Sequence, residues 1–271
     1  QYMDEMTMLE TKLNRLAKNA MGDTPINLAS PDDKSVLLYS RKVKDKSLWS
    51  LTFNLGHEMR GNTIKPKMRT RMKNKDFVQY VRRMTDIVYK TIGRQCETCR
   101  GSGRITPLKK DGSVGKAKRI CKVCEGKGVV YTSTGEVAGF KIIPRTPRDT
   151  ASAGFKTDKV TLEDRLSELS GDAREFCEAY VRYNALRTYL STFVEGMKNN
   201  VDDYNFIHPE FMQCVTATGR LSSRNPNFQN MPRGSTFAIR KVVESRFDDG
   251  FILEGDYSQL EFRVAGFLSK D

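Results

Sequence analysis

Residues 255–271 read GDYSQLEFRVAGFLSKD and follow the apolar run Phe251–Leu253. The apolar run is typical of a buried strand, and the spacing of apolar residues after Ser258 is typical of a helix with one polar face. We therefore expect a strand that ends near Asp256 and a helix over about residues 258–268. A carboxylate between a strand and a helix is a suitable ligand for a divalent cation. If Asp256 binds such a cation, its other ligands must come from elsewhere.

The charge of the chain is unevenly distributed. The chain has 46 Lys and Arg residues against 33 Asp and Glu residues, a net charge of +13. Between Arg41 and Lys127 there are 24 basic and 7 acidic residues, so this region has a balance of +17, whereas the remainder has a balance of −4. A basic field of this size predicts a polyanionic partner, most simply nucleic acid. The alternative is a solvated basic surface that only aids solubility.

The composition is that of a polar, non-membrane protein. No stretch approaches the roughly 18 apolar residues that a membrane span needs. Residues 1–10, QYMDEMTMLE, lack the apolar core of a secretory signal. We therefore expect a cytoplasmic protein with no membrane partner. Because residue 1 is Gln, the chain fits a processed product or an excised fragment.

Four of the six Cys residues form two pairs with the same continuation. CETCRGSG begins at Cys96 and CKVCEGKG begins at Cys121, so each pair follows the pattern CxxCxGxG. Four thiolates at this spacing predict one structural Zn²⁺ with no coordination position open for water, and an iron–sulfur site is the alternative. The expected ligands are Cys96, Cys99, Cys121 and Cys124. The doubled repeat resembles the cysteine-rich zinc module of DnaJ-type chaperones.

The other two Cys residues, Cys177 and Cys214, lie far from these pairs in segments with periodic apolar residues. We expect both to be buried, unreactive thiols.

The hydrophobic pattern predicts helices first, then short strands, then a final helix, which is an α+β order. Ser30 and Pro31 are typical of a helix start. Asp248-Asp249-Gly250 is typical of a turn between two strands. The predicted helices cover residues 4–19, 31–43, 75–92 and 161–198. The predicted strands cover residues 47–56, two short strands within residues 202–223, and two more on either side of the Asp-Asp-Gly turn.

Three stretches toward the C-terminus belong together. They are TATGRLSSRNPNFQNMP (216–232), AIRKV (238–242) and DYSQLEFR (256–263). In this order and spacing they resemble the first motif block and motif A of family A DNA polymerases, the group of bacterial DNA polymerase I and many phage replicases. INLASPDDKSVLLYSRK (26–42) resembles the start of that family's thumb, and GFKTDKVTLEDRL (154–166) resembles its GYST segment.

The resemblance covers about residues 25–43 and 153–271, and the intervening residues depart from it. It implies an α+β fold with a helical thumb, an inserted zinc module and part of an antiparallel-sheet palm. The implied domains are the thumb start at 1–44, a thumb insertion at 45–150 with the zinc module at about 94–130, thumb helices at 151–200, and the first part of the palm at 201–271.

The resemblance also implies roles for individual residues. Asp256 would hold two catalytic Mg²⁺ ions with the carbonyl of Tyr257, and Glu261 would exclude a ribose 2′-OH. Arg240, Gln259 and Glu261 would face the incoming nucleotide, while Arg263 would support the site. Residues implied to contact the primer–template are Arg220, Asn227, Gln229 and Asn230, and the basic insertion adds Lys65, Lys67, Arg69 and Arg71. Without the resemblance, Asp256 would be a helix cap and Glu261 a solvated charge.

The expected function is part of a DNA-directed DNA polymerase that binds primer–template DNA and dNTPs. The family's fingers helix and its later HDE-type motif with a second carboxylate are not found in these residues. We therefore expect no activity from this chain alone and a second polypeptide that supplies the remainder, in a phage-like replicase with a possible processivity factor. The alternatives are a zinc-containing DNA-binding or chaperone-like module without catalysis, and a single-subunit RNA polymerase, against which Glu261 argues.

Overall fold

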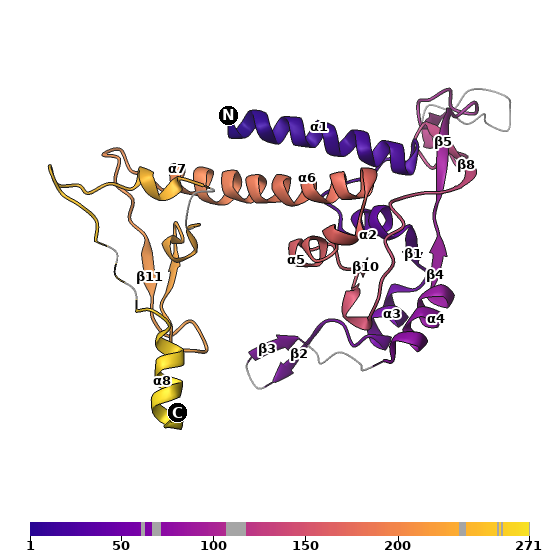
Figure 1. Ribbon diagram of the computed structural model, residues 1–271. Coiled ribbons are helices and arrows are strands. Elements are labelled where there is room, and N and C mark those ends of the chain that lie inside the picture. The colour runs from indigo at the N-terminus through magenta and orange to yellow at the C-terminus, as the bar shows by residue number, and fades with distance from the viewer. Residues whose placement is uncertain are drawn as a thin grey trace. The chain divides into compact units, whose positions relative to one another are not determined.

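The computed structural model describes residues 1–60, 63–66, 72–106, 118–232, 237–253, 255 and 257–270, with the backbone alone for residues 57–60 and 63–66 (Figure 1). The chain divides into two compact units, Gln1–Asn184 and Ala185–Asp271. Both units combine helices with two-stranded antiparallel sheets. The predicted α+β class is therefore confirmed at this coarse level. In the described part of the chain, no helix is both long enough and apolar enough to cross a membrane.

The core of the first unit lies between helices that are far apart in sequence. Helix α1 (Tyr2–Met21) lies beside α6 (Gly171–Thr188) (Figure 1), and α2 (Pro31–Tyr39) packs against the same core. Leu13, Leu37 and Phe176 are almost fully buried in this cluster. The ion pair Arg182–Glu5 also joins α6 to α1, with 2.6 Å between Nε and Oε1. Apolar burial therefore fixes the helical part of this unit.

Helix α2 begins as the sequence predicted and ends earlier. Ser30 Oγ accepts a hydrogen bond from Asp33 N, and Pro31 occupies the first turn. Ser40 then adopts a left-handed conformation with φ 59°, and the chain turns into β1 (Arg41–Val43), which pairs antiparallel with β4 (Thr85–Ile87). The predicted helix over 31–43 is therefore wrong in its last four residues, since Ser40 ends the helix and residues 41–43 pair with a strand 42 to 46 residues away in sequence.

Two further predictions for the insertion are wrong. Residues 47–56 are not a strand but contain α3 (Lys46–Thr52), because Asp45 caps it by accepting from Leu48 N at 2.9 Å. Trp49 of α3 is fully buried and packs edge-on against Phe53. The predicted helix over 75–92 is shorter, since α4 (Asn74–Met84) gives way to β4 and then to β5 (Tyr89–Gln95).

The remaining strands of the first unit are short, apart from one long ribbon. Strand β5 pairs antiparallel with β8 (Val129–Val137). The cysteine motifs adjoin one end of this ribbon, and the small antiparallel pair of β6 (Arg104–Ile105) and β7 (Arg119–Ile120) lies between them in the sequence. The other described pairs are β2–β3 and β9–β10. Their strands are β2 (His57–Arg60), β3 (Thr63–Pro66), β9 (Thr150–Ala151) and β10 (Gly154–Phe155). Three short helices also belong to this unit, namely η1 (Pro147–Asp149), α5 (Lys159–Glu163) and η2 (Leu166–Glu168).

The second unit is smaller and less densely packed. It begins with the last residues of α6, which continues through a π-helical turn η3 (Tyr189–Val194) into α7 (Glu195–Lys198). Strands β11 (Glu210–Met212) and β12 (Ser222–Arg224) pair antiparallel, which confirms the short strands predicted there. The short helices η4 (Phe228–Asn230) and η5 (Ile239–Val242) follow, and α8 (Leu260–Ser269) confirms the final predicted helix.

Two predictions for the second half need correction. The helix predicted over 161–198 is interrupted between α5 and α6, where Leu169 is extended and Gly171 has a φ of 55°. The strands predicted around Asp248–Gly250 are absent from the described residues of that stretch. Phe251 and Leu253 are 85% and 87% exposed, so these apolar residues have no partner strand or layer among the described residues.

Candidate functional sites

The four predicted zinc ligands form one buried cluster. Their sulfur atoms all lie within 4.8 Å of one another. Cys96 Sγ is 3.8 Å from Cys121 Sγ, and Cys99 Sγ is 3.6 Å from Cys124 Sγ. A tetrahedral zinc site with Zn–S bonds of about 2.3 Å requires sulfur–sulfur distances of about 3.8 Å. The cluster therefore has the ligand number and spacing that zinc requires.

The backbone of the two CxxCxGxG segments builds this cluster. Gly101 N donates to Cys96 O at 3.3 Å, and Gly126 N donates to Cys121 O at 3.2 Å, so the two turns are alike. The segments also bind each other, because Cys96 N donates to Gly128 O at 2.8 Å and Cys121 N donates to Gly103 O at 2.9 Å.

Glycine is required where these turns meet. Gly103 and Gly128 have φ values of 68° and 75°, and a Cβ on either residue would collide with the backbone oxygen of Gly126 or Gly101. The repeated glycines of the motif therefore bring the four thiols together.

The protonation of these thiols is perturbed in opposite directions. Burial and hydrogen bonds with the Cys124 and Cys96 thiols raise the pKa of Cys99 to about 11. Burial also acts to raise the pKa of Cys124, but hydrogen bonds from Gly128 N and from neighbouring groups lower it to about 7. Because thiolates are the ligands of zinc, a bound cation would favour deprotonation throughout the cluster.

The two remaining Cys residues differ from each other. Cys177 is fully buried in the helical core, and burial raises its pKa to about 12, as expected of an unreactive thiol. Cys214 is exposed and has a φ of 60° in the loop that joins β11 to β12. The prediction that Cys214 is buried is wrong, because in the described structure no second layer covers this two-stranded ribbon.

The second candidate site lies in the unit formed by residues 185–271. Arg220 Nη2 is 2.8 Å from Glu261 Oε1, so the structure brings together one predicted DNA contact and the predicted sugar gate. Both side chains are about three-quarters exposed, at 74% and 76%. An ion pair this exposed contributes little stability, so both groups are free to exchange partners.

Several predicted site residues lie outside the described structure. Asp256 is outside the described residues, as are Lys67, Arg69 and Arg71, and the side chain of Lys65 is not described. Tyr257 is 80% exposed, and Gln259 precedes α8 with a φ of 52°. The roles assigned to these residues stay predictions.

The motif block at 216–232 forms an ordered turn. Asn227 Oδ1 accepts hydrogen bonds from Gln229 N at 3.1 Å and from Asn230 N at 3.2 Å, so its side chain shapes the backbone. Gln229 and Asn230 are thereby held with exposed side chains. Arg240 Nη2 donates to Met231 O at 3.2 Å and connects the AIRKV stretch to this block.

His208 has a structural role in the described residues. Its Nε2 lies 2.9 Å from Asp202 Oδ2, and the other oxygen of Asp202 accepts from Tyr204 N and Phe206 N. The hydrogen bond with His208, followed by that from Phe206 N, lowers the pKa of Asp202. His208 therefore stabilises a loop.

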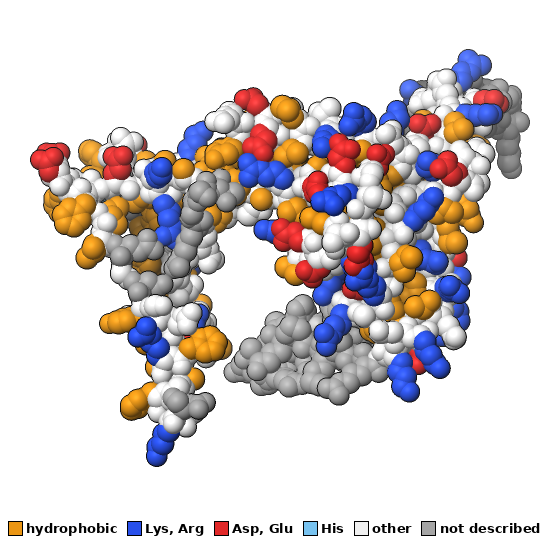
Figure 2. All heavy atoms as spheres, in the orientation of Figure 1, with side chains coloured by type: hydrophobic (Ala, Val, Ile, Leu, Met, Phe, Trp, Pro, Cys, Tyr) orange, Lys and Arg blue, Asp and Glu red, His pale blue; other side chains and the backbone are white. Residues whose placement is uncertain are grey.

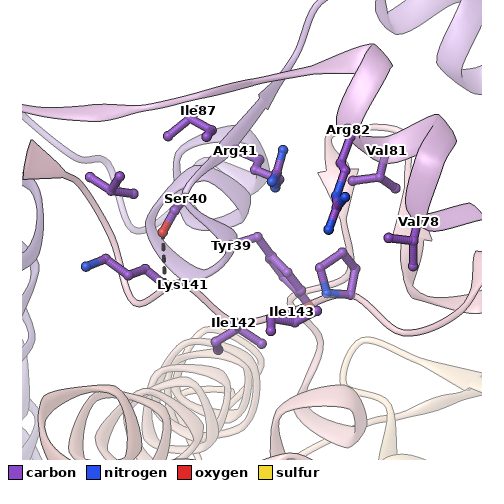
Figure 3. A pocket seen from close by; sticks show the side chains of 12 residues that line it. Tyr39, Ser40, Arg41, Val78, Val81, Arg82, Ile87, Lys141, Ile142 and Ile143 are labelled. Carbon is purple, nitrogen blue, oxygen red and sulfur yellow. Dashed lines mark hydrogen bonds between the residues drawn. The ribbon is translucent and has the colours of Figure 1, made fainter.

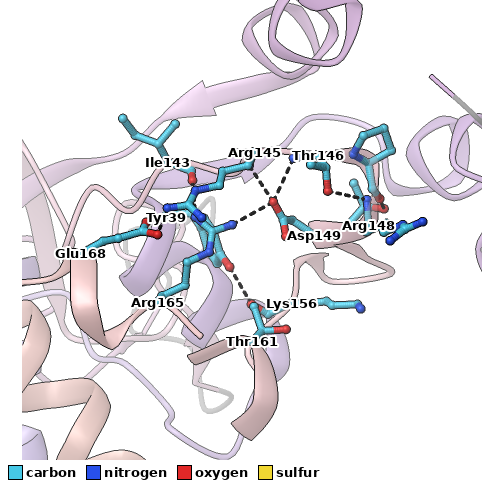
Figure 4. A network of polar contacts seen from close by, with 12 residues as sticks. Tyr39, Ile143, Arg145, Thr146, Arg148, Asp149, Lys156, Thr161, Arg165 and Glu168 are labelled. Atoms are coloured by element: carbon cyan, nitrogen blue, oxygen red, sulfur yellow. Dashed lines mark hydrogen bonds and ion pairs between the residues drawn. The ribbon is translucent and has the colours of Figure 1, made fainter. Parts of the chain in front are cut away.

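Sequence reasoning missed a polar network that fastens the end of the insertion (Figure 4). Arg165 Nη2 is 2.9 Å from Asp149 Oδ2, and Arg165 Nη1 donates to Ile143 O at 2.9 Å. The same carboxylate oxygen accepts from the backbone N–H groups of Arg145 and Thr146. Thr146 and Asp149 form a capping box with Pro147 in the first turn, and this short pattern is a signal for the network that the sequence offers.

Comparison with known proteins identifies the C-terminal part of the chain. The sequence pattern described as DNA polymerase family A matches residues 140–271. Residues 140–271 belong to DNA polymerase family A. This polymerase segment contains AIRKV and DYSQLEFR, and therefore Arg240, Asp256 and Glu261.

Individual relatives agree with this assignment. DNA polymerase I of Synechocystis is 38% identical over 121 residues, which is 44% of this chain and 12% of the relative. DNA polymerase I of Bacillus subtilis is 36% identical over 119 residues, 43% of this chain and 13% of the relative. The DNA polymerase of Bacillus phage SP01 is 31% identical over 175 residues, 60% of this chain and 18% of the relative. The matched part therefore spans less than a fifth of the length of these relatives.

A solved structure is also similar in sequence. The POL domain of Pol1 from M. smegmatis, in complex with DNA primer–template and dNTP, is 31% identical, and the match covers 45% of this chain and 21% of that domain. Its TM-score of 0.36 is too low to support an argument about the fold.

Proposed function

We propose that this chain takes part in template-directed DNA synthesis as the thumb and the first half of the palm of a DNA polymerase. One observation carries the proposal, namely the match of residues 140–271 to DNA polymerase family A. The basic balance of residues 41–127 supports it, because a DNA polymerase must hold a polyanion.

The proposed catalytic residues are Asp256, Tyr257 and Glu261. The Asp256 carboxylate and the Tyr257 carbonyl would hold Mg²⁺, which stabilises the attacking and leaving oxygens in phosphoryl transfer. Glu261 would occupy the space beside C2′ of the incoming sugar and exclude a ribose hydroxyl. In the described structure Glu261 pairs with Arg220, and because both side chains are exposed this pair can open when a nucleotide binds.

Arg240, Gln259 and the exposed amides form the proposed substrate contacts. Gln229 and Asn230, which the Asn227 turn holds outward, would donate hydrogen bonds in the minor groove. Acceptors in that groove are shared by all base pairs, so such contacts test pairing geometry rather than sequence.

The exposed apolar residues around Asp256 indicate that a further polypeptide segment covers them in the working enzyme. This segment would belong either to a longer form of the same chain or to a separate chain. Phe262 and Phe267 of α8 are 79% and 83% exposed, and hydrophobic side chains stand out along this helix in Figure 2. A helix that is apolar and exposed on several sides requires a partner. We propose that this partner carries the second metal-binding carboxylate and the fingers.

The zinc module is proposed to be structural, since all four coordination positions are filled by Cys. Its basic surroundings would contact duplex DNA or a processivity factor. Removing residues 94–128 should shorten the products of each binding event and weaken the salt dependence of DNA binding. Unchanged processivity would restrict the module to a structural brace.

Primer extension tests the proposed activity. The chain is combined with a polypeptide that carries the fingers and second carboxylate of a family A polymerase, and extension of a labelled primer is measured with dNTPs. Asp256→Ala should lower extension on the order of a thousandfold or more, because a metal ligand is lost. The control Asp203→Ala, an exposed acid outside the motifs, should extend like the unaltered chain.

Full extension by Asp256→Ala would contradict the proposal. DNA binding without extension by any combination would favour the alternative, a zinc-containing DNA-binding module. Glu261→Ala should raise incorporation of rNTPs relative to dNTPs, and rNTP preference in the unaltered enzyme would indicate an RNA polymerase instead.

A further inference from the structure

A pocket of about 240 Å³ lies in the first unit, and none of its lining residues is a candidate metal ligand. Its walls come from the end of α2 and the start of β1, from α4 and β4, and from residues 137–144 (Figure 3). Binding sites for drug-sized molecules have volumes of about 300–1,000 Å³, so this pocket suits one or two side chains.

The floor and rim of the pocket are apolar. Tyr39, Val81 and Ile142 are 7% exposed or less and form the floor. Ile87 and Ile143, at 44% and 75% exposed, form part of the rim. An apolar side chain that enters the pocket would therefore lose water on most of its surface, which favours binding.

The charged residues of the lining are all basic. They are Arg41, Arg82 and Lys141. Figure 3 shows Arg41 and Arg82 on one side of Tyr39 and Lys141 on the other. Cations on both sides of an apolar pocket favour a ligand in which negatively charged groups flank an apolar group.

These cations are available to a ligand to different degrees. Arg41 Nη1 donates to Thr85 Oγ1 at 3.1 Å, which holds the guanidinium in place. The other N–H groups of the guanidinium can still donate to a ligand. Within the described residues Arg82 forms no ion pair. The hydrogen bond with Lys90, 2.7 Å away, is the main cause that lowers the pKa of Glu136, and the charge of Lys141 adds to it from a greater distance without a direct ion pair.

The walls are held in place by hydrogen bonds. Lys141 N donates to Ser40 Oγ at 2.9 Å (Figure 3), and Ile142 N donates to Leu38 O at 2.9 Å. On the far side, Arg165 holds Ile143 O through the network of Figure 4. A pocket fixed in this way loses little conformational entropy when a ligand binds.

We propose that this pocket binds a short acidic peptide segment of a partner protein, with one bulky apolar side chain in the pocket and carboxylates on Arg41, Arg82 and Lys141. A nucleic-acid backbone lacks the apolar group that the floor requires. The lining also has no exposed aromatic ring on which a base would stack, since Tyr39 is buried with its hydroxyl bonded to Lys156 O. The proposal does not depend on polymerase activity.

Peptide binding to the full 271-residue, zinc-loaded chain tests this site. The probe is the fluorescein-labelled heptapeptide DEDFDED, and binding is measured by fluorescence anisotropy. The matched peptide DEDADED keeps the charge and lacks the apolar side chain, and it should bind about tenfold more weakly. Equal binding of the two peptides, or no binding of DEDFDED, would overturn the proposal.

Variants locate the site. Arg82→Glu should weaken binding of DEDFDED at least about tenfold. Arg83→Glu makes the same charge change at the next residue of α4, which is exposed and outside the pocket, and should weaken binding much less. Ile143→Asp, at an exposed rim position, should also weaken binding. Equal effects of Arg82→Glu and Arg83→Glu would reduce the interaction to general charge attraction and would overturn the proposal.

Binding of a 20-base-pair DNA duplex to the same variants tests whether the pocket binds nucleic acid instead of a peptide. Arg82→Glu and Arg83→Glu should weaken duplex binding to a similar extent, because each removes a cation from the same basic region. A selective loss of duplex binding in Arg82→Glu with unchanged peptide binding would assign the pocket to DNA and overturn the proposal. Circular dichroism of each variant verifies folding.

Discussion

The cysteine cluster and the residues around Asp256 are both candidate metal sites, but the chain builds them to different extents. In the cysteine cluster, four buried ligand atoms lie within 4.8 Å of one another. Beside Asp256, the side chains of Phe251, Leu253 and Tyr257 are 80% exposed or more. The described residues by themselves assemble the cysteine cluster. They supply only part of the surroundings of Asp256.

The difference follows from the sequence separation of the parts. Each Cys pair is closed by a turn of a few residues, and the two turns are joined by the antiparallel ribbon β5–β8. Short loops cost little entropy to close, so such a site forms locally. The proposed polymerase site would combine segments that are distant in the sequence, and the apolar residues beside Asp256 are exposed among the described residues.

Loss of zinc is expected to have the largest effect. Cys121→Ser should release the metal and unfold residues 94–130, because binding of structural zinc contributes about 10–16 kcal/mol in small zinc domains at neutral pH. Emission of the single Trp, Trp49, should stay unchanged, since it lies in the separate helical core. Metal analysis of the unaltered chain should find about one zinc ion per chain.

The exposed Cys214 provides the control for that experiment. Cys214→Ser should keep the zinc and the fold. Iron in place of zinc would identify an iron–sulfur site, and retention of zinc by Cys121→Ser would remove Cys121 from the ligand set.

Breaking the buried ion pair at the end of the insertion is expected to have the next largest effect. Arg165 and Asp149 side chains are 7% and 15% exposed. Arg165→Met should lower the free energy of unfolding by about 3–5 kcal/mol, because Asp149 is left buried without its cation. Arg174→Met breaks an exposed pair with Glu178 and should cost about 0.5 kcal/mol or less. Urea unfolding followed by Trp49 emission measures both, and equal costs would show that burial is not decisive.

Truncation of aromatic side chains compares the packed and the exposed parts directly. Phe176→Ala in the helical core should cost about 3–5 kcal/mol, whereas Phe267→Ala on α8 should change the free energy of unfolding by less than about 0.5 kcal/mol. Phe267→Ala should instead weaken association with the partner segment in the primer-extension experiment. A large loss of stability from Phe267→Ala in the chain alone would mean that α8 is already packed.

The smallest expected effect concerns pH. The hydrogen bond from Arg182 holds the pKa of Glu5 below its ordinary value of 4.5. The pair therefore stabilises the fold above about pH 4.5, and this contribution is lost as the pH falls through the lowered pKa. Since the pair is partly exposed, solvent screening limits its contribution to less than about 1 kcal/mol. Glu5→Gln should remove this pH-dependent part, measured as the difference in urea midpoints between pH 7 and pH 3.

Features encoded over a few residues were predictable from the sequence. Ser30 and Pro31 start α2 as expected, and the CxxCxGxG repeats form the cysteine cluster. The polymerase motifs were readable as ordered short stretches, and the family match includes them. Features that depend on pairing across the chain were missed, such as β4 with β1 and the Arg165–Asp149 network.

The sequence by itself determined the family of residues 140–271, the four thiols that cluster and the general α+β order, because each rests on local spacing or on a contiguous motif. The tertiary structure decided that Trp49 lies on a helix, that residues 85–87 form a strand and that Cys214 is exposed. It also decided that three cations surround an apolar pocket. These features arise from contacts between segments tens of residues apart, and local periodicity contains no information about which distant segment will supply the partner.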